Sequence, residues 1–236
     1  MSTEELFREN AYLKTCDATV TAVDGGRVFV DRTVFYPMGG GQPGDSGELM
    51  SADGATIRIV DARKDSETGE IAHIIEDGMA PPGVGERVTL AIDWSRRFRH
   101  MRLHSCMHML CSLIPFGVTG GSISEDRARL DFDMQEPLDK EALTAQLNQV
   151  IAGDHPMRTR WITEEELDAK PDLVRTMSVQ PPRGSGRIRL VNFEGVDLQP
   201  CGGTHVASTG EIGAVKVQKI EKKGKHNRRV IVVFDE

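Results

Sequence analysis

The chain has 236 residues, of which 39% are hydrophobic and 28% are charged, and its formal net charge is −7. This length provides one large domain or two small ones. It contains no run near the about 18 apolar residues of a membrane span, and its polar, acidic start is unlike a signal peptide. Four irregularly spaced cysteines predict no disulfide framework, so we expect a cytoplasmic protein.

Short apolar runs alternate with turn residues over the first ninety positions. The intervening segments are rich in Gly, Asp and Ser. Strands are expected at 18–23, 26–35, 55–62, 71–76 and 86–93. Many short strands at close spacing, separated by glycine turns, predict a small antiparallel β-barrel.

The pattern changes near residues 92–95. Residues 95–114 contain neither Gly nor Pro and predict a helix of about twenty residues, with Ser95 as its N-cap. We therefore expect a β-barrel domain over residues 1–93 and a second domain over 94–236.

The second domain is predicted to be α+β, with helices packed on an antiparallel sheet. Residues 139–154 form an amphipathic pattern that places Leu143, Leu147 and Val150 on one helix face. The remaining expected elements are a loop at 120–126, strands at 127–134, 157–163, 187–195, 213–223 and 228–236, and a helix at 163–174 that Pro171 interrupts.

Two residue pairs have the spacing of metal ligands. His104 and His108 are one turn apart on the predicted helix, so both can face one ion. Cys201 and His205 lie on a glycine-rich turn that can bring their side chains together. Three imidazoles and one thiolate are a donor set typical of zinc. Either pair alone also arises by chance, but both in one chain favour a metal site.

The spacing leaves the number of ligands open. Four protein ligands are typical of a structural zinc site, whereas a catalytic site keeps one position for water. His205 is therefore either a fourth ligand or a general base. Cys106 and Cys111 are interpreted as helix core.

These motifs resemble those of the alanyl-tRNA editing domain, which occurs in alanyl-tRNA synthetases and in the freestanding AlaX editing proteins. HSCMH (104–108) and CGGTH (201–205) match its HxxxH and CxxxH motifs, and TVFYPMGGGQPGDSG (33–47) resembles its glycine-rich motif. Residues 210–234 resemble its C-terminal sheet. The chain is similar to the medium-length AlaX type, because the short type lacks the glycine-rich domain and the long type has a further C-terminal segment.

The resemblance implies a hydrolase that deacylates tRNA(Ala) mischarged with serine, and often with glycine. It implies one zinc ion per chain at His104, His108, Cys201 and His205. No membrane and no obligate protein partner are expected. Two other functions stay open, namely an RNA-binding module with a structural zinc and no turnover, and a zinc hydrolase of a small ester or amide.

Serine differs from alanine by one hydroxyl, which a site can select by hydrogen bonding, since alanine would leave the polar groups of that site unpaired. We expect Thr33 and Gln42 to provide these groups, with Gly40 and Gly41 beside the substrate, because in the family the glycine-rich segment borders the editing pocket. Alternatively, Thr33 is an ordinary strand residue and the glycines only shape a turn. The segment lacks the Gly-Lys-Ser/Thr ending of a phosphate loop.

Residues 216–229, here called the basic strip, hold five Lys and two Arg against one Glu, a local net charge of +6. Charge runs are usually solvated faces. In a predicted tRNA enzyme, however, we expect phosphate contacts from this strip and from a second cluster ahead of the histidine pair. The second cluster is Arg96, Arg97, Arg99 and Arg102, and the strongest candidates of the strip are Lys223, Lys225, Arg228 and Arg229.

Overall fold

The structure, a computed structural model, describes residues 3–177 and 186–236. The chain divides into two compact units, Met1–Phe98 and Arg99–Glu236, here called unit 1 and unit 2. In the part of the chain that the structure describes, no helix combines the length and the apolar character needed to cross a membrane.

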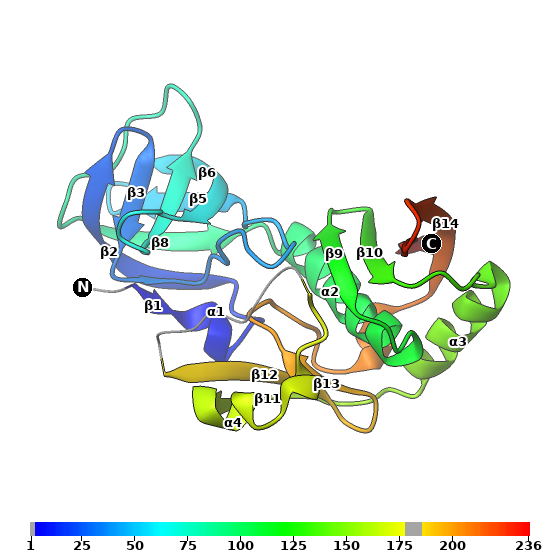
Figure 1. Ribbon diagram of the computed structural model, residues 1–236. Coiled ribbons are helices and arrows are strands. Elements are labelled where there is room, and N and C mark those ends of the chain that lie inside the picture. Colours follow the sequence, from blue (N-terminus) through cyan, green and yellow to red (C-terminus); the bar gives the residue numbers. More distant parts are fainter. Residues whose placement is uncertain (1–2, 178–185) are drawn as a thin grey trace. The chain divides into compact units, whose positions relative to one another are not determined.

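Unit 1 is built on a closed barrel of six antiparallel strands (Figure 1). Alternate residues of these strands face the interior, as Val88, Leu90 and Ile92 do in the last strand. The order around the barrel is β2 (Thr15–Asp24), β3 (Arg27–Val30), β7 (Ile71–Ile75), β6 (Thr56–Lys64), β5 (Gly47–Ser51) and β8 (Arg87–Ile92). The predicted small antiparallel barrel is confirmed.

The start of unit 1 differs in detail from the prediction. The single strand expected over 26–35 is divided into β3 and β4 (Arg32–Thr33). Strand β4 pairs in parallel with β1 (Glu4–Glu5), outside the barrel, and α1 (Leu6–Glu9) follows β1. Strand β5 was not predicted, because it begins inside the glycine-rich segment, which we interpreted as a turn.

Gly47 opens β5 at a close approach to β8. A Cβ atom at this position would lie 2.1 Å from the Ala91 oxygen and 2.9 Å from the Phe35 ring. We therefore expect Gly47→Ala to lower the free energy of unfolding by about 1–3 kcal/mol, which a denaturant titration measures. Gly83→Ala is the matched control, because its added Cβ would lie 3.7 Å from the Glu86 carboxylate. Unchanged stability in Gly47→Ala would contradict this close approach.

Helix α2 (Trp94–Leu113) has 20 residues, as expected, and runs from unit 1 into unit 2. The prediction of Ser95 as its N-cap is wrong, since Ser95 lies within the helix. The Asp93 carboxylate instead accepts the Arg96 N–H at 3.0 Å, and its carbonyl accepts the Arg97 N–H at 3.0 Å. Aspartate is as good an N-cap as serine. The error arose because we assigned Asp93 to the preceding strand.

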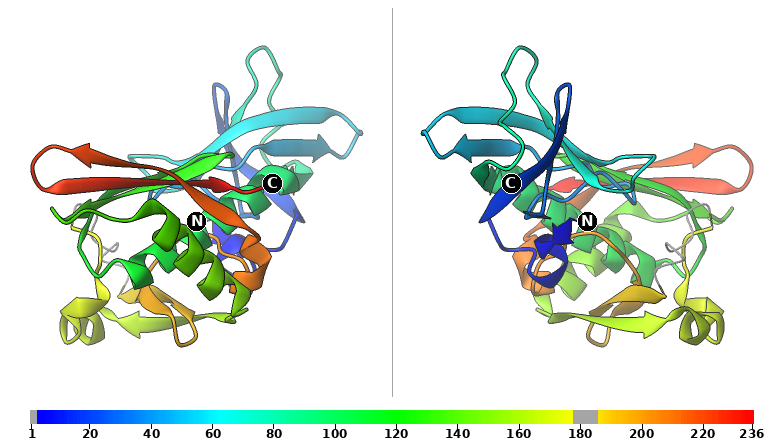
Figure 2. Two further views of the ribbon diagram at one scale, coloured as in Figure 1. Left: turned by 90° about the vertical axis from the view of Figure 1, so that its right-hand side faces the viewer. Right: turned by 90° about the vertical axis from the view of Figure 1, so that its left-hand side faces the viewer.

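Unit 2 contains two antiparallel sheets, and Figure 2 shows α2 and α3 (Lys140–Ala152) between them. The four-stranded sheet has the order β14 (Val215–Lys223), β15 (Asn227–Phe234), β10 (Arg127–Asp133) and β9 (Val118–Ile123). The three-stranded sheet has the order β11 (Met157–Thr163), β12 (Arg187–Phe193) and β13 (Asp197–Pro200). The short helices are α4 (Glu164–Asp168), η1 (Pro171–Leu173) and η2 (Thr209–Ile212). This arrangement confirms the predicted α+β class.

Two local predictions in unit 2 are corrected. Most of the expected loop at 120–126 belongs to β9, where a Cβ on Gly121 would lie 2.9 Å from the Leu130 side chain. This glycine therefore permits a close strand approach and does not form a turn. On α3, Ile151 is buried together with Leu143 and Leu147, whereas Val150 is only half-buried.

Candidate metal centre

Four side chains with metal-binding atoms converge in unit 2. His104 and His108 lie one turn apart on α2, and Cys201 and His205 come from the loop after β13. Their ligand atoms all lie within 4.8 Å of one another. The three histidines are buried and Cys201 is half-buried. The structure thus brings together the two pairs that we identified by spacing.

The distances between the donor atoms fit a zinc ion. Cys201 Sγ lies 3.4 Å from His104 Nε2 and 3.5 Å from His205 Nε2. His205 Nε2 lies 3.1 Å from His108 Nε2. Zinc binds nitrogen at about 2.0–2.1 Å and sulfur at about 2.3 Å, which separates tetrahedral ligands by roughly 3.3–3.7 Å. These three distances are therefore close to the spacing that one ion requires, and all separations in the cluster are within 4.8 Å.

A carboxylate orients one of the histidines. Asp197 Oδ2 accepts hydrogen bonds from His108 Nδ1 at 2.7 Å and from Gln199 Nε2 at 2.9 Å. With its proton on Nδ1, His108 presents the lone pair of Nε2 to the other donors. We did not predict Asp197 or Gln199. The signal was present, because positions 197, 199 and 201 alternate along one extended segment and so share a face.

Burial and neighbouring charges set the ionisation of the cluster. Burial raises the pKa of the Cys201 thiol, but His104 and His205 outweigh this effect and hold the pKa well below its ordinary value. Burial lowers the pKa of His205 well below its ordinary value. Burial also lowers the pKa of His108, but Asp197 and Cys201 outweigh it and raise that pKa to about 9. A metal must displace the extra proton of His108, so the affinity of the site for a metal should decrease as the pH is lowered.

The carboxylate of Asp197 should contribute to metal affinity without being a ligand. We expect Asp197→Asn to weaken zinc binding about 10–100-fold, because an amide holds the His108 ring less firmly. Competition with a chromophoric chelator measures this change. Asp133→Asn, at an exposed aspartate of β10, is the control and should leave the zinc dissociation constant unchanged. Equal affinity in the two variants would contradict the role of Asp197.

The two cysteines of α2 are core residues, as we interpreted them. Cys106 is fully buried and Cys111 is 5% exposed. Burial raises the pKa of each thiol to about 12, so neither is a thiolate at neutral pH.

Thr33 is fully buried in unit 1, where its hydroxyl is engaged. Thr33 Oγ1 lies 2.8 Å from His73 Nε2 and accepts the Phe35 N–H at 3.0 Å. His73 Nδ1 lies 3.1 Å from the Val28 carbonyl oxygen, which requires the ring proton on Nδ1. Burial lowers the pKa of His73 to about 4, so the ring is neutral. The Thr33 hydroxyl therefore donates a hydrogen bond to His73, and toward any further group its oxygen can only accept.

Gln42 closes the turn of the glycine-rich segment and is fully buried. Its backbone exchanges two hydrogen bonds with Gly39, of 2.9 and 3.1 Å. Gly40 and Gly41 lie between them with φ angles of 56° and 81°, in the left-handed region that favours glycine. These glycines shape a tight turn, and their contact with a substrate stays a prediction.

The basic strip follows the hairpin of β14 and β15, drawn in orange and red in Figure 2. Part of its charge is neutralised, because Arg229 donates to both oxygens of Asp131, at 2.7 and 2.8 Å. The other candidates differ: Lys223 lies 3.2 Å from Glu221, Arg228 donates to the Gln135 carbonyl, and Lys225 is exposed. Lys225 and Lys223 are thus better placed for phosphate than Arg229.

The second basic cluster is mostly structural. Arg97 is fully buried and forms an ion pair with Asp45, so its guanidinium cannot reach a phosphate. Arg99 and Arg102 lie over the Phe234 ring, at 4.6 and 4.0 Å from its centroid.

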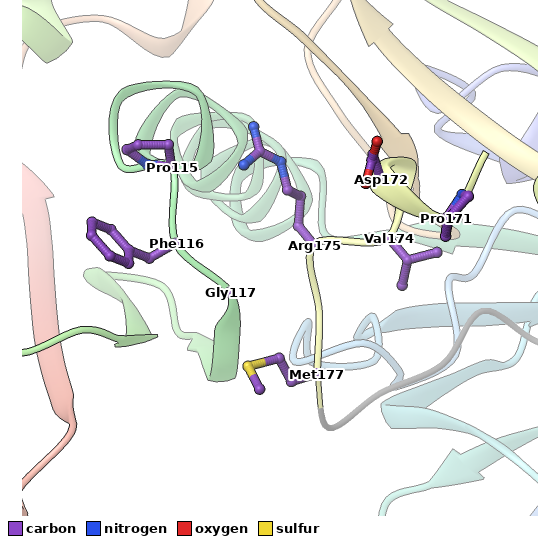
Figure 3. Close-up of a pocket in the computed structure, with 8 residues that line it drawn as sticks. All are labelled: Pro115, Phe116, Gly117, Pro171, Asp172, Val174, Arg175 and Met177. Carbon is purple, nitrogen blue, oxygen red and sulfur yellow. The ribbon is translucent and has the colours of Figure 1, made fainter.

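An open hollow of about 510 Å³ lies in unit 2 (Figure 3). One of its walls is held in place by backbone pairing, since the Val118 N–H donates to the Arg175 oxygen at 2.9 Å and the Met177 N–H donates to the Val118 oxygen at 2.8 Å. The lining residues are Pro115, Phe116, Gly117, Pro171, Asp172, Val174, Arg175 and Met177. The four metal-site residues are not among them.

Two family models match the chain. Residues 5–96 match the class II (A) tRNA synthetases, and residues 188–231 match the threonyl and alanyl tRNA synthetase second additional domain. The second match includes Cys201 and His205, whereas the histidines of α2 lie between the two matched segments.

Individual relatives cover nearly the whole chain. The alanyl-tRNA editing protein AlaX-M of Methanosarcina mazei is 37% identical over 97% of this chain and 95% of its own length. That of Saccharolobus solfataricus is 36% identical over 97% of both chains. The alanyl-tRNA editing protein AlaX-L of Pyrococcus horikoshii is 33% identical over 96% of this chain, but over only 57% of its own length. The resemblance drawn from the motifs is confirmed, and the chain belongs to the AlaX-M family of alanyl-tRNA editing proteins.

Proposed function

We propose that this protein is a trans-editing deacylase, which hydrolyses the ester of tRNA(Ala) mischarged with serine and, as a second substrate, glycine. The observation that carries the proposal is the convergence of four metal-binding side chains within 4.8 Å, in a chain whose relatives are named alanyl-tRNA editing proteins. An aminoacyl ester is activated compared with an amide. A metal site and a well-positioned substrate therefore suffice without a Ser or Cys nucleophile.

His104, His108, Cys201 and His205 would hold one zinc ion. When bound, zinc supplies Lewis acidity for an ester carbonyl and for water. The chain supplies the orientation, since Asp197 holds the His108 ring with Nε2 toward the other donors. Cys201 contributes a thiolate charge, and the burial of the histidines keeps bulk water from their ring nitrogens.

Whether His205 is a ligand determines whether the ion keeps a coordination position for water. Its Nε2 lies at ligand distance from Cys201 and His108, and its Nδ1 is buried with no hydrogen-bond partner among residues 3–177 and 186–236. The distances of Nε2 from the other donors favour His205 as a ligand. The missing partner of Nδ1 does not distinguish the two roles, since a base and a metal ligand are both normally oriented by a further group.

A second function is supported by the same convergence. Four protein donors around one ion are typical of a structural zinc site. The protein would then be an RNA-binding module that has no turnover. The catalytic proposal requires the ion to accept a fifth partner or to release His205 during the reaction.

We propose that unit 1 contributes the selection of serine. The Thr33 hydroxyl donates its hydrogen bond to His73, so it can only accept a hydrogen bond from a serine hydroxyl. The amide of Gln42 can donate or accept. Alanine lacks the hydroxyl that would form these hydrogen bonds, which would be the basis of discrimination against it.

Binding of tRNA should depend steeply on salt if the basic strip contacts phosphates. We expect Lys223→Glu and Lys225→Glu each to weaken binding and to reduce the slope of log affinity against log salt by about 1. Fluorescence anisotropy with labelled tRNA(Ala) over a salt series measures the slope. Lys140→Glu, at the exposed start of α3, is the control. A slope unchanged in both strip variants would exclude the strip from the interface.

The proposed activity is tested by following the deacylation of Ser-tRNA(Ala) and of Ala-tRNA(Ala) in parallel. We expect fast loss of serine while alanine is retained. A small serine ester, tested beside them, separates this proposal from a general esterase. Equal hydrolysis of the free ester and of Ser-tRNA(Ala) would exclude a tRNA-editing function.

A further inference from the structure

Arg189 is a buried arginine beside the metal centre, with 7% of its surface exposed. It lies in β12, the central strand of the three-stranded sheet. Its neighbours Ile188 and Leu190 pack in a hydrophobic cluster on one face of this strand. Because side chains alternate along a strand, Arg189 faces the same side as Phe193, whose ring centroid lies 5.6 Å from that of His108.

The backbone of Arg189 is paired with a metal-binding residue. The register of β12 and β13 places Val191 opposite Gln199. Two residues further along, the Cys201 N–H donates to the Arg189 carbonyl at 3.1 Å. The ladder therefore continues as far as Cys201 and fixes where the metal-binding loop begins.

The side chain of Arg189 also binds the loop that carries Cys201 and His205. Its Nη1 donates to the Cys201 carbonyl at 2.9 Å and to the Gly203 carbonyl at 3.0 Å. Both carbonyls belong to the irregular segment that separates Cys201 from His205. Burying a guanidinium is costly unless it is hydrogen-bonded. These two bonds thus tie the loop firmly to β12.

We propose that Arg189 is a positioning residue that holds the Cys201–His205 loop in its metal-binding shape before the metal arrives. A loop without this restraint must be ordered when the ion binds, and the lost conformational entropy weakens binding. The inference rests on the metal site of the proposed function, but it does not depend on the tRNA substrate or on turnover.

The test is a zinc titration of the metal-free full chain against a chelator. Arg189→Met keeps the length of the side chain but removes its donors, and it should raise the zinc dissociation constant about 10–100-fold. Arg189→Lys retains the charge without the rigid fork of donors. Its zinc dissociation constant should lie between those of Arg189→Met and the unchanged protein. Arg160→Met, at an exposed arginine of the neighbouring strand β11, is the matched control and should not alter zinc affinity.

Two further readouts separate positioning from a general structural role. At saturating cobalt, the sulfur-to-metal charge-transfer band should be shifted or weakened in Arg189→Met, because Cys201 is no longer held in place. A merely structural role would lower the melting temperature of the metal-free protein and leave this band unchanged. If Arg189→Met does not fold, the same measurements are made on Arg189→Lys.

An unchanged zinc dissociation constant together with an unchanged cobalt spectrum would overturn the proposal. Tight zinc binding by the unchanged protein without any deacylation would refute the proposed function alone, and Arg189 would keep its role. If the unchanged protein bound no zinc at all, the role of Arg189 would be refuted together with the metal site.

Discussion

Replacing Cys201 by alanine is expected to remove the bound metal and, with it, the hydrolysis of Ser-tRNA(Ala). Cys201 is the sulfur donor of the cluster, and the neighbouring histidines hold the pKa of its thiol well below its ordinary value. Losing a ligand should cost more than losing an orienting residue, so we expect zinc affinity to fall by more than about 100-fold. Hydrolysis should fall at least about 100-fold as well, since a Lewis acid supplies several kcal/mol to the transition state.

A second cysteine variant is the control for Cys201→Ala. Cys16→Ala changes a cysteine of unit 1 that is not part of the cluster, and it should retain both zinc and activity. Metal content by elemental analysis and deacylation of Ser-tRNA(Ala) are measured on the same samples. Full zinc occupancy in Cys201→Ala would contradict the ligand set. His205→Ala, treated alike, should also lose zinc, whereas retained zinc with lost hydrolysis would identify His205 as the base.

Breaking the buried ion pair of unit 1 is expected to be the most destabilising single change in that unit. The Arg97 guanidinium contacts both carboxylate oxygens of Asp45 and donates to the carbonyls of Ala11 and Val34, at 3.0 and 2.7 Å. Asp45 also accepts the Tyr36 N–H at 2.6 Å. Arg97→Met would leave this carboxylate buried without its cation, which costs about 3–5 kcal/mol.

Denaturant unfolding of the two single variants and one double variant tests this ion pair. Arg97→Met and Asp45→Leu should each unfold at clearly lower denaturant concentration. The double variant Arg97→Met/Asp45→Leu should be less destabilised than the sum of two single changes, because it leaves no isolated charge. Strict additivity of the changes would contradict the coupling between the two side chains.

Local patterns were sufficient to predict the elements that carry strong periodicity. The length of α2, the alternation in the barrel strands and the spacing of His104 with His108 are all local properties of the chain. They predicted the fold class and suggested that two ligand pairs meet. The family resemblance, based on the motifs, added what no periodicity contains, namely the chemistry and the substrate.

What could not be predicted depends on contacts between distant segments. Asp197 and Gln199 lie in a short polar strand that looks like a loop until β12 pairs with it. Likewise, Thr33 finds its partner His73 forty residues later, after the barrel has closed. Arg97 looked like a surface charge, because a buried arginine is recognised only when its carboxylate partner, Asp45, is known.

The measurement that tests the central claim most directly is the deacylation of Ser-tRNA(Ala) by one preparation of the full chain in three states. These states are the protein as purified, after removal of metal with a chelator, and after the return of one equivalent of zinc. We expect hydrolysis in the first state, its loss in the second and its recovery in the third. Hydrolysis that persists without metal, or tRNA binding with no turnover at any zinc level, would contradict a zinc-dependent editing enzyme.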